Sequence, residues 1–72
     1  MKIKNMSSPE RLSTDEAFKV MINFLEKYYI RTGSDDIASI LSDVRLLEKE
    51  KTSDPAAWSD WIDSVNKIIN LR

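Results

Sequence analysis

Carboxylate side chains are the groups in this sequence best placed to do chemistry. Asp60 and Asp63 lie three residues apart, which on a helix places them one turn from each other. Such a pair can share a hard cation, meet an arginine of a partner protein, or act as a catalytic acid and base. Asp35, Asp36 and Asp43 add carboxylates to the middle of the chain. The alternative for all five is that they solvate exposed helix faces or complement the start of a helix.

The residues that usually work with catalytic carboxylates are missing from this chain. Its 72 residues include no cysteine and no histidine, which excludes disulfides, zinc sites of the Cys/His type and nucleophiles activated by histidine. With a single glycine, the glycine-rich phosphate-binding motifs cannot occur. A chain of this length also has no second domain with which to form a deep cleft. We therefore expect a protein that is not an enzyme and that has no cofactor and no metal site.

The net charge of −1 conceals an uneven distribution along the chain. Residues 1–31 carry a net charge of +2, residues 32–63 carry −5, and residues 64–72 carry +2. An acidic middle segment repels phosphates and attracts basic protein surfaces, so we expect a protein partner and no nucleic-acid partner. No segment approaches the ~20 apolar residues of a membrane helix, and the first residues lack the apolar centre of a signal peptide. We expect no membrane partner and a cytoplasmic location.

Three helices are expected to position these side chains. Apolar residues recur with helical spacing over about 14–31, 35–47 and 55–70. No segment alternates apolar and polar residues convincingly, so the sequence gives no support for a sheet. The predicted fold class is all-α, a small three-helix bundle. Residues 12–72 are expected to form this single helical domain, and residues 1–11 a mobile N-terminal arm.

Local signals mark where these helices begin and end. Ser13 and Glu16 have the spacing of a capping box. Gly33 stands where a left-handed C-terminal cap belongs, and Asp54 followed by a proline is a strong helix start. The segment between the second and third helices, residues 48–53, is entirely polar and is expected to be a solvated connector.

The aromatic residues are expected to divide between the core and the surface. Phe24 and Trp61 lie within apolar stripes and are predicted to fill the core. Tyr28 and Tyr29 are adjacent and cannot both point inward, so one of them, with Trp58, is expected at the surface. Exposed aromatic residues beside acidic ones are typical of protein-binding hot spots. The candidate partner-binding residues are Tyr29, Asp35, Asp36, Asp43, Trp58, Asp60 and Asp63.

Two blocks of sequence resemble a known group of proteins. Residues 31–37, Arg-Thr-Gly-Ser-Asp-Asp-Ile, and residues 54–61, Asp-Pro-Ala-Ala-Trp-Ser-Asp-Trp, resemble small uncharacterised bacterial helical proteins. Some of these resemble immunity proteins of polymorphic-toxin and contact-dependent inhibition systems. The resemblance covers about residues 12–70 and implies no functional residue. Residues 48–53 lack the glycine-containing turn that is expected at that place.

Two functions remain open from the sequence. The first is a non-catalytic protein-binding module, a bacterial immunity protein that neutralises a basic toxin domain through an acidic helical surface. The second is a homodimeric structural or regulatory helical module, because a domain this small often needs additional buried area.

Overall fold

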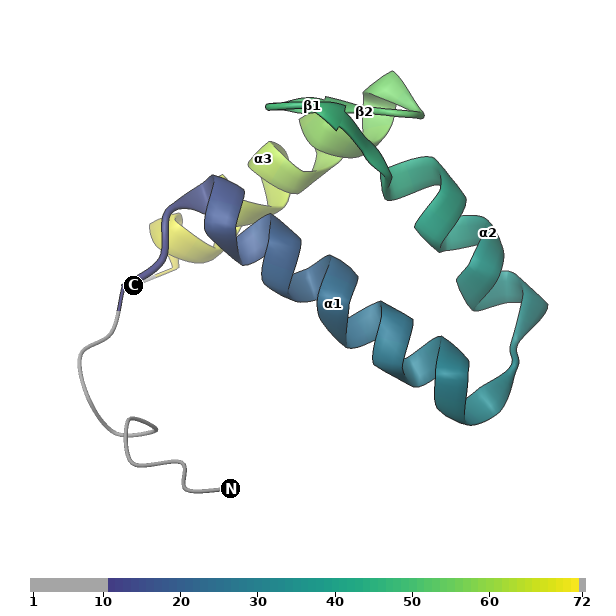
Figure 1. The fold of residues 1–72 in the computed structure, drawn as a ribbon. Helices are drawn as coiled ribbons and strands as arrows, with labels where there is room; N and C mark the ends of the chain where they lie inside the picture. Colours follow the sequence, from purple (N-terminus) through teal and green to yellow (C-terminus); the bar gives the residue numbers. More distant parts are fainter. Residues whose placement is uncertain (1–10, 72) are drawn as a thin grey trace.

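The computed structural model describes residues 11–71, which form three helices and a short hairpin (Figure 1). The three predicted helices are confirmed. The predicted N-terminal arm, except for Arg11, lies outside the described residues. In chain order the elements are α1 (Thr14–Thr32), α2 (Asp35–Val44), β1 (Leu46–Glu48), β2 (Lys51–Thr52) and α3 (Pro55–Asn70).

The helix starts follow the capping signals in the sequence. Before α1, the Ser13 hydroxyl accepts the Glu16 N–H at 3.0 Å, and the Glu16 carboxylate accepts the Ser13 N–H at 2.9 Å. This is the predicted capping box, which satisfies two backbone donors that have no partner within the helix. Before α3, the Asp54 carboxylate accepts the Ala56 N–H at 3.1 Å, and Pro55 occupies the first turn.

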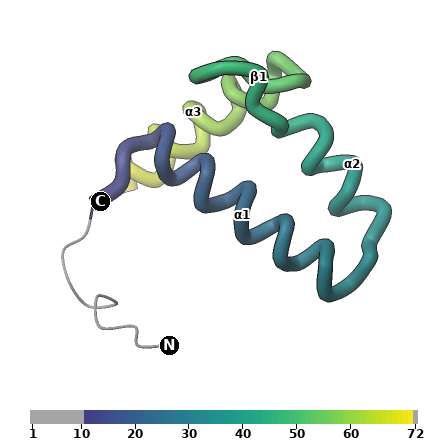
Figure 2. The backbone as a smooth tube through the Cα atoms, viewed as in Figure 1, coloured from purple at the N-terminus to yellow at the C-terminus, as the bar shows by residue number. Residues whose placement is uncertain are grey.

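A two-residue link turns the chain from α1 into α2. Gly33 has φ 65°, the left-handed conformation of a C-terminal cap, and its N–H donates to the Tyr29 carbonyl at 2.7 Å. The next residue, Ser34, already caps α2 by accepting the Ile37 N–H. The two helices therefore fold back on each other, as the chain trace shows (Figure 2).

Phe18 is the centre of the hydrophobic core. It is 1% exposed, the only apolar residue fully buried among residues 11–71. Trp58 and Trp61 from α3 meet its ring edge-to-face, each with a centroid separation of 5.2 Å. The Trp61 indole N–H also donates to the Thr14 carbonyl at 3.1 Å. These contacts hold α3 against the N-terminal half of α1 and leave the C-terminal half of α1 beside α2 (Figure 1).

The prediction for the segment between the second and third helices was wrong. The second helix ends at Val44 instead of continuing to residue 47, and a two-stranded antiparallel hairpin follows, with Leu46 opposite Thr52 and Glu48 opposite Lys51. Backbone hydrogen bonds explain the difference. The Ser53 N–H donates to the Arg45 carbonyl at 2.8 Å, and the Asp54 N–H donates to the Asp43 carbonyl at 2.9 Å. The chain entering α3 thus donates hydrogen bonds to backbone carbonyls at the end of α2. In a longer helix these carbonyls would accept hydrogen bonds from the helix itself and could not bind the chain before α3.

The hairpin turn contains a residue in an unfavourable conformation. Glu50 has φ 61°, and it is the only described residue other than glycine with positive φ. Its Cβ makes this conformation costly, so we expect Glu50→Gly to raise the free energy of unfolding by about 0.5–1 kcal/mol. Urea unfolding followed by circular dichroism would measure the change. The control is Glu48→Gly in β1, which should lower stability; if both variants are destabilised alike, the turn holds no such strain.

Candidate protein-binding surfaces

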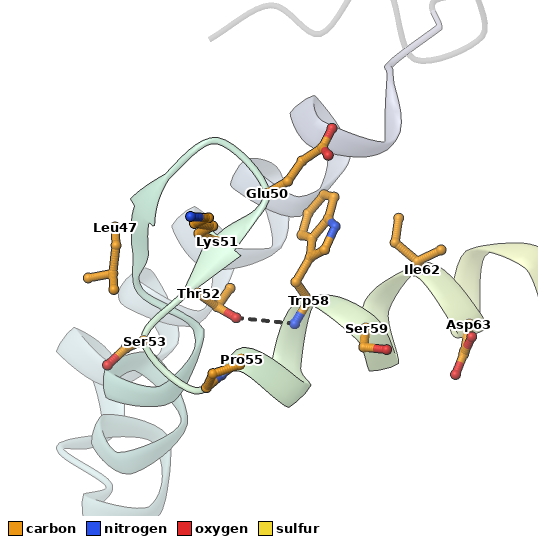
Figure 3. Close-up of a pocket in the computed structure, with 10 residues that line it drawn as sticks. All are labelled: Leu47, Glu50, Lys51, Thr52, Ser53, Pro55, Trp58, Ser59, Ile62 and Asp63. Carbon is orange, nitrogen blue, oxygen red and sulfur yellow. Dashed lines mark hydrogen bonds between the residues drawn. The ribbon is translucent and has the colours of Figure 1, made fainter.

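A groove between the hairpin and α3 contains two of the predicted site residues, Trp58 and Asp63. It has a volume of about 570 Å³, and Figure 3 shows its lining side chains. Leu47, Pro55 and Ile62 provide apolar surface, and Leu47 is 60% exposed. We call this feature the hairpin–α3 groove. Its full lining is Leu47, Glu50, Lys51, Thr52, Ser53, Pro55, Trp58, Ser59, Ile62 and Asp63.

Thr52 fixes the hairpin to the first turn of α3 and so shapes the groove. Its side chain is buried, with 3% exposure. The hydroxyl donates to the Asp54 carbonyl and accepts the Trp58 N–H at 3.2 Å (Figure 3). In a regular helix that N–H would bond the carbonyl four residues earlier, which is the carbonyl of Asp54. The Thr52 hydroxyl is therefore inserted into the helical hydrogen-bond ladder, and β2 and α3 are joined as one unit.

The charge at the hairpin–α3 groove is mixed but has more acids than bases. Glu50 and Asp63 line it beside Lys51. Lys51 also lies 3.5 Å from the Glu48 carboxylate, an ion pair whose two side chains are about two-thirds exposed. An exposed pair of this kind contributes little to stability, so both side chains can exchange partners at low cost. The groove combines apolar contact area with carboxylates that can accept hydrogen bonds from arginine or lysine.

The structure brings together only some of the predicted site residues. Trp58 and Asp63 share the hairpin–α3 groove, although Trp58 is only partly exposed, because its ring packs on Phe18. Asp60, one turn from Asp63, lines a different groove on the other side of α3. Asp35 and Asp36 lie in the first turn of α2, at the end remote from the hairpin; the ten residues of α2 span about 15 Å.

The two remaining candidates, Asp43 and Tyr29, do not line the groove. Asp43 is exposed near the end of α2, and its carbonyl accepts the Asp54 N–H. Tyr29 is 38% exposed, and its neighbour Tyr28 is 37% exposed, so both adjacent tyrosines are partly accessible. The candidate carboxylates therefore do not form one continuous acidic face.

A second groove separates α3 from α1 and α2. It has a volume of about 280 Å³ and is lined by Phe18, Met21, Val44, Ala57, Asp60, Trp61 and Ser64. Beyond it, Phe24 is 60% exposed, so the prediction that this residue fills the core was wrong. The apolar stripe of α1 is continuous, but α3 covers only its N-terminal half. Sequence periodicity gives the direction in which a side chain points and not the length of helix that a neighbour covers.

Comparison with known proteins identifies no family for this chain. No protein-family model matches this chain, and no curated protein or solved structure matches it. Within residues 11–71, no group of three or more acidic or other metal-ligating side chains could hold a metal ion. None of the helices in this range combines the length and hydropathy of a membrane span.

Proposed function

We propose that this chain is a non-catalytic protein-binding module whose hairpin–α3 groove contacts a basic partner. The observation that carries the proposal is the presence in one groove of exposed apolar side chains, the Trp58 indole and the carboxylates of Glu50 and Asp63. Apolar centres with aromatic anchors and a charged rim are characteristic of protein interfaces. The proposed contact uses only the acidic residues at the hairpin end, because Asp35 and Asp36 lie at the other end of α2.

The groove suits recognition of arginine or lysine side chains. A basic side chain can lay its aliphatic part along Leu47 and Ile62 while its charged end reaches Asp63 or Glu50. The carboxylates also accelerate encounter with a positively charged surface. No cysteine or histidine is present to provide a nucleophile or a proton shuttle, which supports a binding role over a catalytic one.

The biological setting that we propose is toxin neutralisation in the bacterial cytoplasm. The two sequence blocks motivate this choice, because they resemble small uncharacterised bacterial proteins, some of which resemble immunity proteins. The partner would be a toxin domain with a basic substrate groove. An acidic module that occupies such a groove excludes the toxin's substrate without needing any chemistry of its own.

The test is binding to the product of the neighbouring gene, produced together with this chain and measured by titration calorimetry after purification. We expect Asp63→Lys to weaken binding by about tenfold or more, since it places a cation against a basic partner. The matched control is Asp35→Lys, an identical charge reversal at the remote end of α2, which should change affinity by less than about threefold.

Two results would contradict the proposal. One is failure to bind or protect against any neighbouring gene product. The other is an equal loss of affinity in Asp63→Lys and Asp35→Lys, which would indicate a general response to net charge. Affinity should also fall as salt concentration rises, because the steering charges are exposed.

A further inference from the structure

An apolar face remains uncovered on the side of α1 and α2 where α3 lies. Met21 and Val44 line the groove beside α3. Phe24 and Tyr28 continue from Met21 at steps of three and four residues along α1, and Ile40 precedes Val44 by four residues along α2. We call these five residues the open face. Phe24, Tyr28 and Ile40 are 60%, 37% and 43% exposed, respectively.

The two aromatic side chains of the open face, Phe24 and Tyr28, lie beside each other on α1. The Phe24 and Tyr28 rings have a centroid separation of 6.3 Å. The Arg31 guanidinium lies 4.7 Å from the centroid of the Tyr28 ring. Arg31, Tyr28 and Phe24 thus lie in a row along the C-terminal half of α1, with the two rings tilted by 51° to each other. Ordering of exposed aromatic side chains before binding reduces the entropy that an interface must overcome.

The exposed apolar area of the open face is large enough to form the apolar centre of a protein interface. A full aromatic side chain offers about 150–250 Å², so Phe24 and Tyr28 together expose roughly 200 Å². With Ile40 and the half-buried Met21 and Val44, the exposed apolar area is on the order of 350 Å². An interface of standard size takes about 800 Å² from each partner, and a little over half of it is apolar. The open face supplies most of the apolar area that such an interface needs.

The charges at the two ends of the open face favour a second copy of this chain as the occupant. Arg31 lies at one end, on the last turn of α1. Asp60 lies at the other end, on α3, where it lines the same groove as Met21 and Val44. A two-fold axis through the centre of the face would bring Arg31 of each copy to Asp60 of the other. A surface with a cation at one end and a carboxylate at the other is complementary to itself.

The small core gives an independent reason for self-association. Phe18 is the only apolar side chain fully buried in residues 11–71, and a domain of this size gains little stability from one such residue. A second copy is present whenever the chain is made, whereas a different partner is not. We propose that two copies of this chain associate through the open face, with a two-fold axis that pairs Arg31 with Asp60.

The test is sedimentation equilibrium of the full chain between about 1 and 200 μM. This concentration range detects weak dimers as well as tighter dimers with an interface of standard size. We expect wild-type protein to reach twice its 8.3 kDa mass at the upper end of the range. Phe24→Glu should sediment as a monomer with unchanged helix content, because Phe24 is 60% exposed in the single chain. The matched control is Leu47→Glu, a residue with the same 60% exposure in the hairpin–α3 groove, which should remain dimeric.

A charge exchange tests the predicted two-fold arrangement without relying on Phe24. Arg31→Glu and Asp60→Arg should each weaken the dimer about tenfold, and the double variant should recover most of the loss. Wild-type protein that remains a monomer at 200 μM, or a Phe24→Glu protein that still forms dimers, overturns the proposal. Asp63→Lys should leave the dimer intact and Phe24→Glu should leave partner binding intact, so failure of this inference is distinguishable from failure of the proposed function.

Discussion

Phe18→Ala is expected to lower the free energy of unfolding by about 3–5 kcal/mol. The ring is 1% exposed and contacts Trp58 and Trp61 at centroid separations of 5.2 Å, so truncation leaves a cavity between α1 and α3. For a chain of 72 residues the total stability is only about 4–11 kcal/mol. If the total stability lies near the lower end of this range, the variant is partly or wholly unfolded at 25 °C. Urea titration followed by tryptophan fluorescence reports on it directly, since both indoles contact the deleted ring.

The matched control is Phe24→Ala, the same truncation at an exposed site on the same helix. Measured at a concentration low enough to exclude self-association, it should lower stability by less than about 1 kcal/mol. Phe18→Leu provides a second comparison, because it conserves much of the volume and should cost about 1.5 kcal/mol. If Phe18→Ala unfolds at the same urea concentration as wild-type protein, Phe18 is not the residue that joins α1 to α3.

Thr52→Val is expected to have the second large effect, lowering the free energy of unfolding by about 1–3 kcal/mol. Valine has nearly the same shape, but it removes the hydroxyl that donates to the Asp54 carbonyl and accepts the Trp58 N–H. Since Thr52 is only 3% exposed, water cannot readily replace those bonds. Thermal unfolding of the two proteins measures the loss.

Thr52→Ser separates the hydroxyl from the methyl group. Serine keeps both hydrogen bonds and should recover more than half of the stability that valine loses. The result that would contradict this interpretation is a serine variant as unstable as the valine variant, which would assign the effect to packing of the Thr52 methyl. The hairpin–α3 groove should widen only in Thr52→Val, since that variant alone releases β2 from α3.

The sequence predicts the helices well because their signals are local. The Ser13–Glu16 capping box, Gly33 and Asp54 act over three or four residues, and the structure has each of them in the predicted role. The hairpin was not predictable in the same way. Its strands have two and three residues with no apolar alternation, and they depend on hydrogen bonds between segments that enter and leave it.

The candidate site was predictable in composition but not in arrangement. Trp58 and Asp63 were identified because an aromatic residue beside an acid suits an interface, and they share one groove. Net charge along the chain could not reveal that Asp35 and Asp36 are separated from them by the length of α2. Nor could periodicity reveal that Phe24 is exposed, because α3 covers only part of the apolar stripe on α1.

The two-residue link at Gly33 and Ser34 favours early pairing of α1 with α2. Because α1 and α2 are adjacent in sequence, their pairing closes a very short loop and forms rapidly. Docking of α3 on α1 depends on contacts between residues far apart in the sequence. The Trp61 indole, for example, donates to the Thr14 carbonyl across a separation of 47 residues. We therefore expect the helical pair to form before α3 docks against α1. Substitutions at the α1–α3 contact should then act mainly by accelerating unfolding, with little effect on the rate of folding.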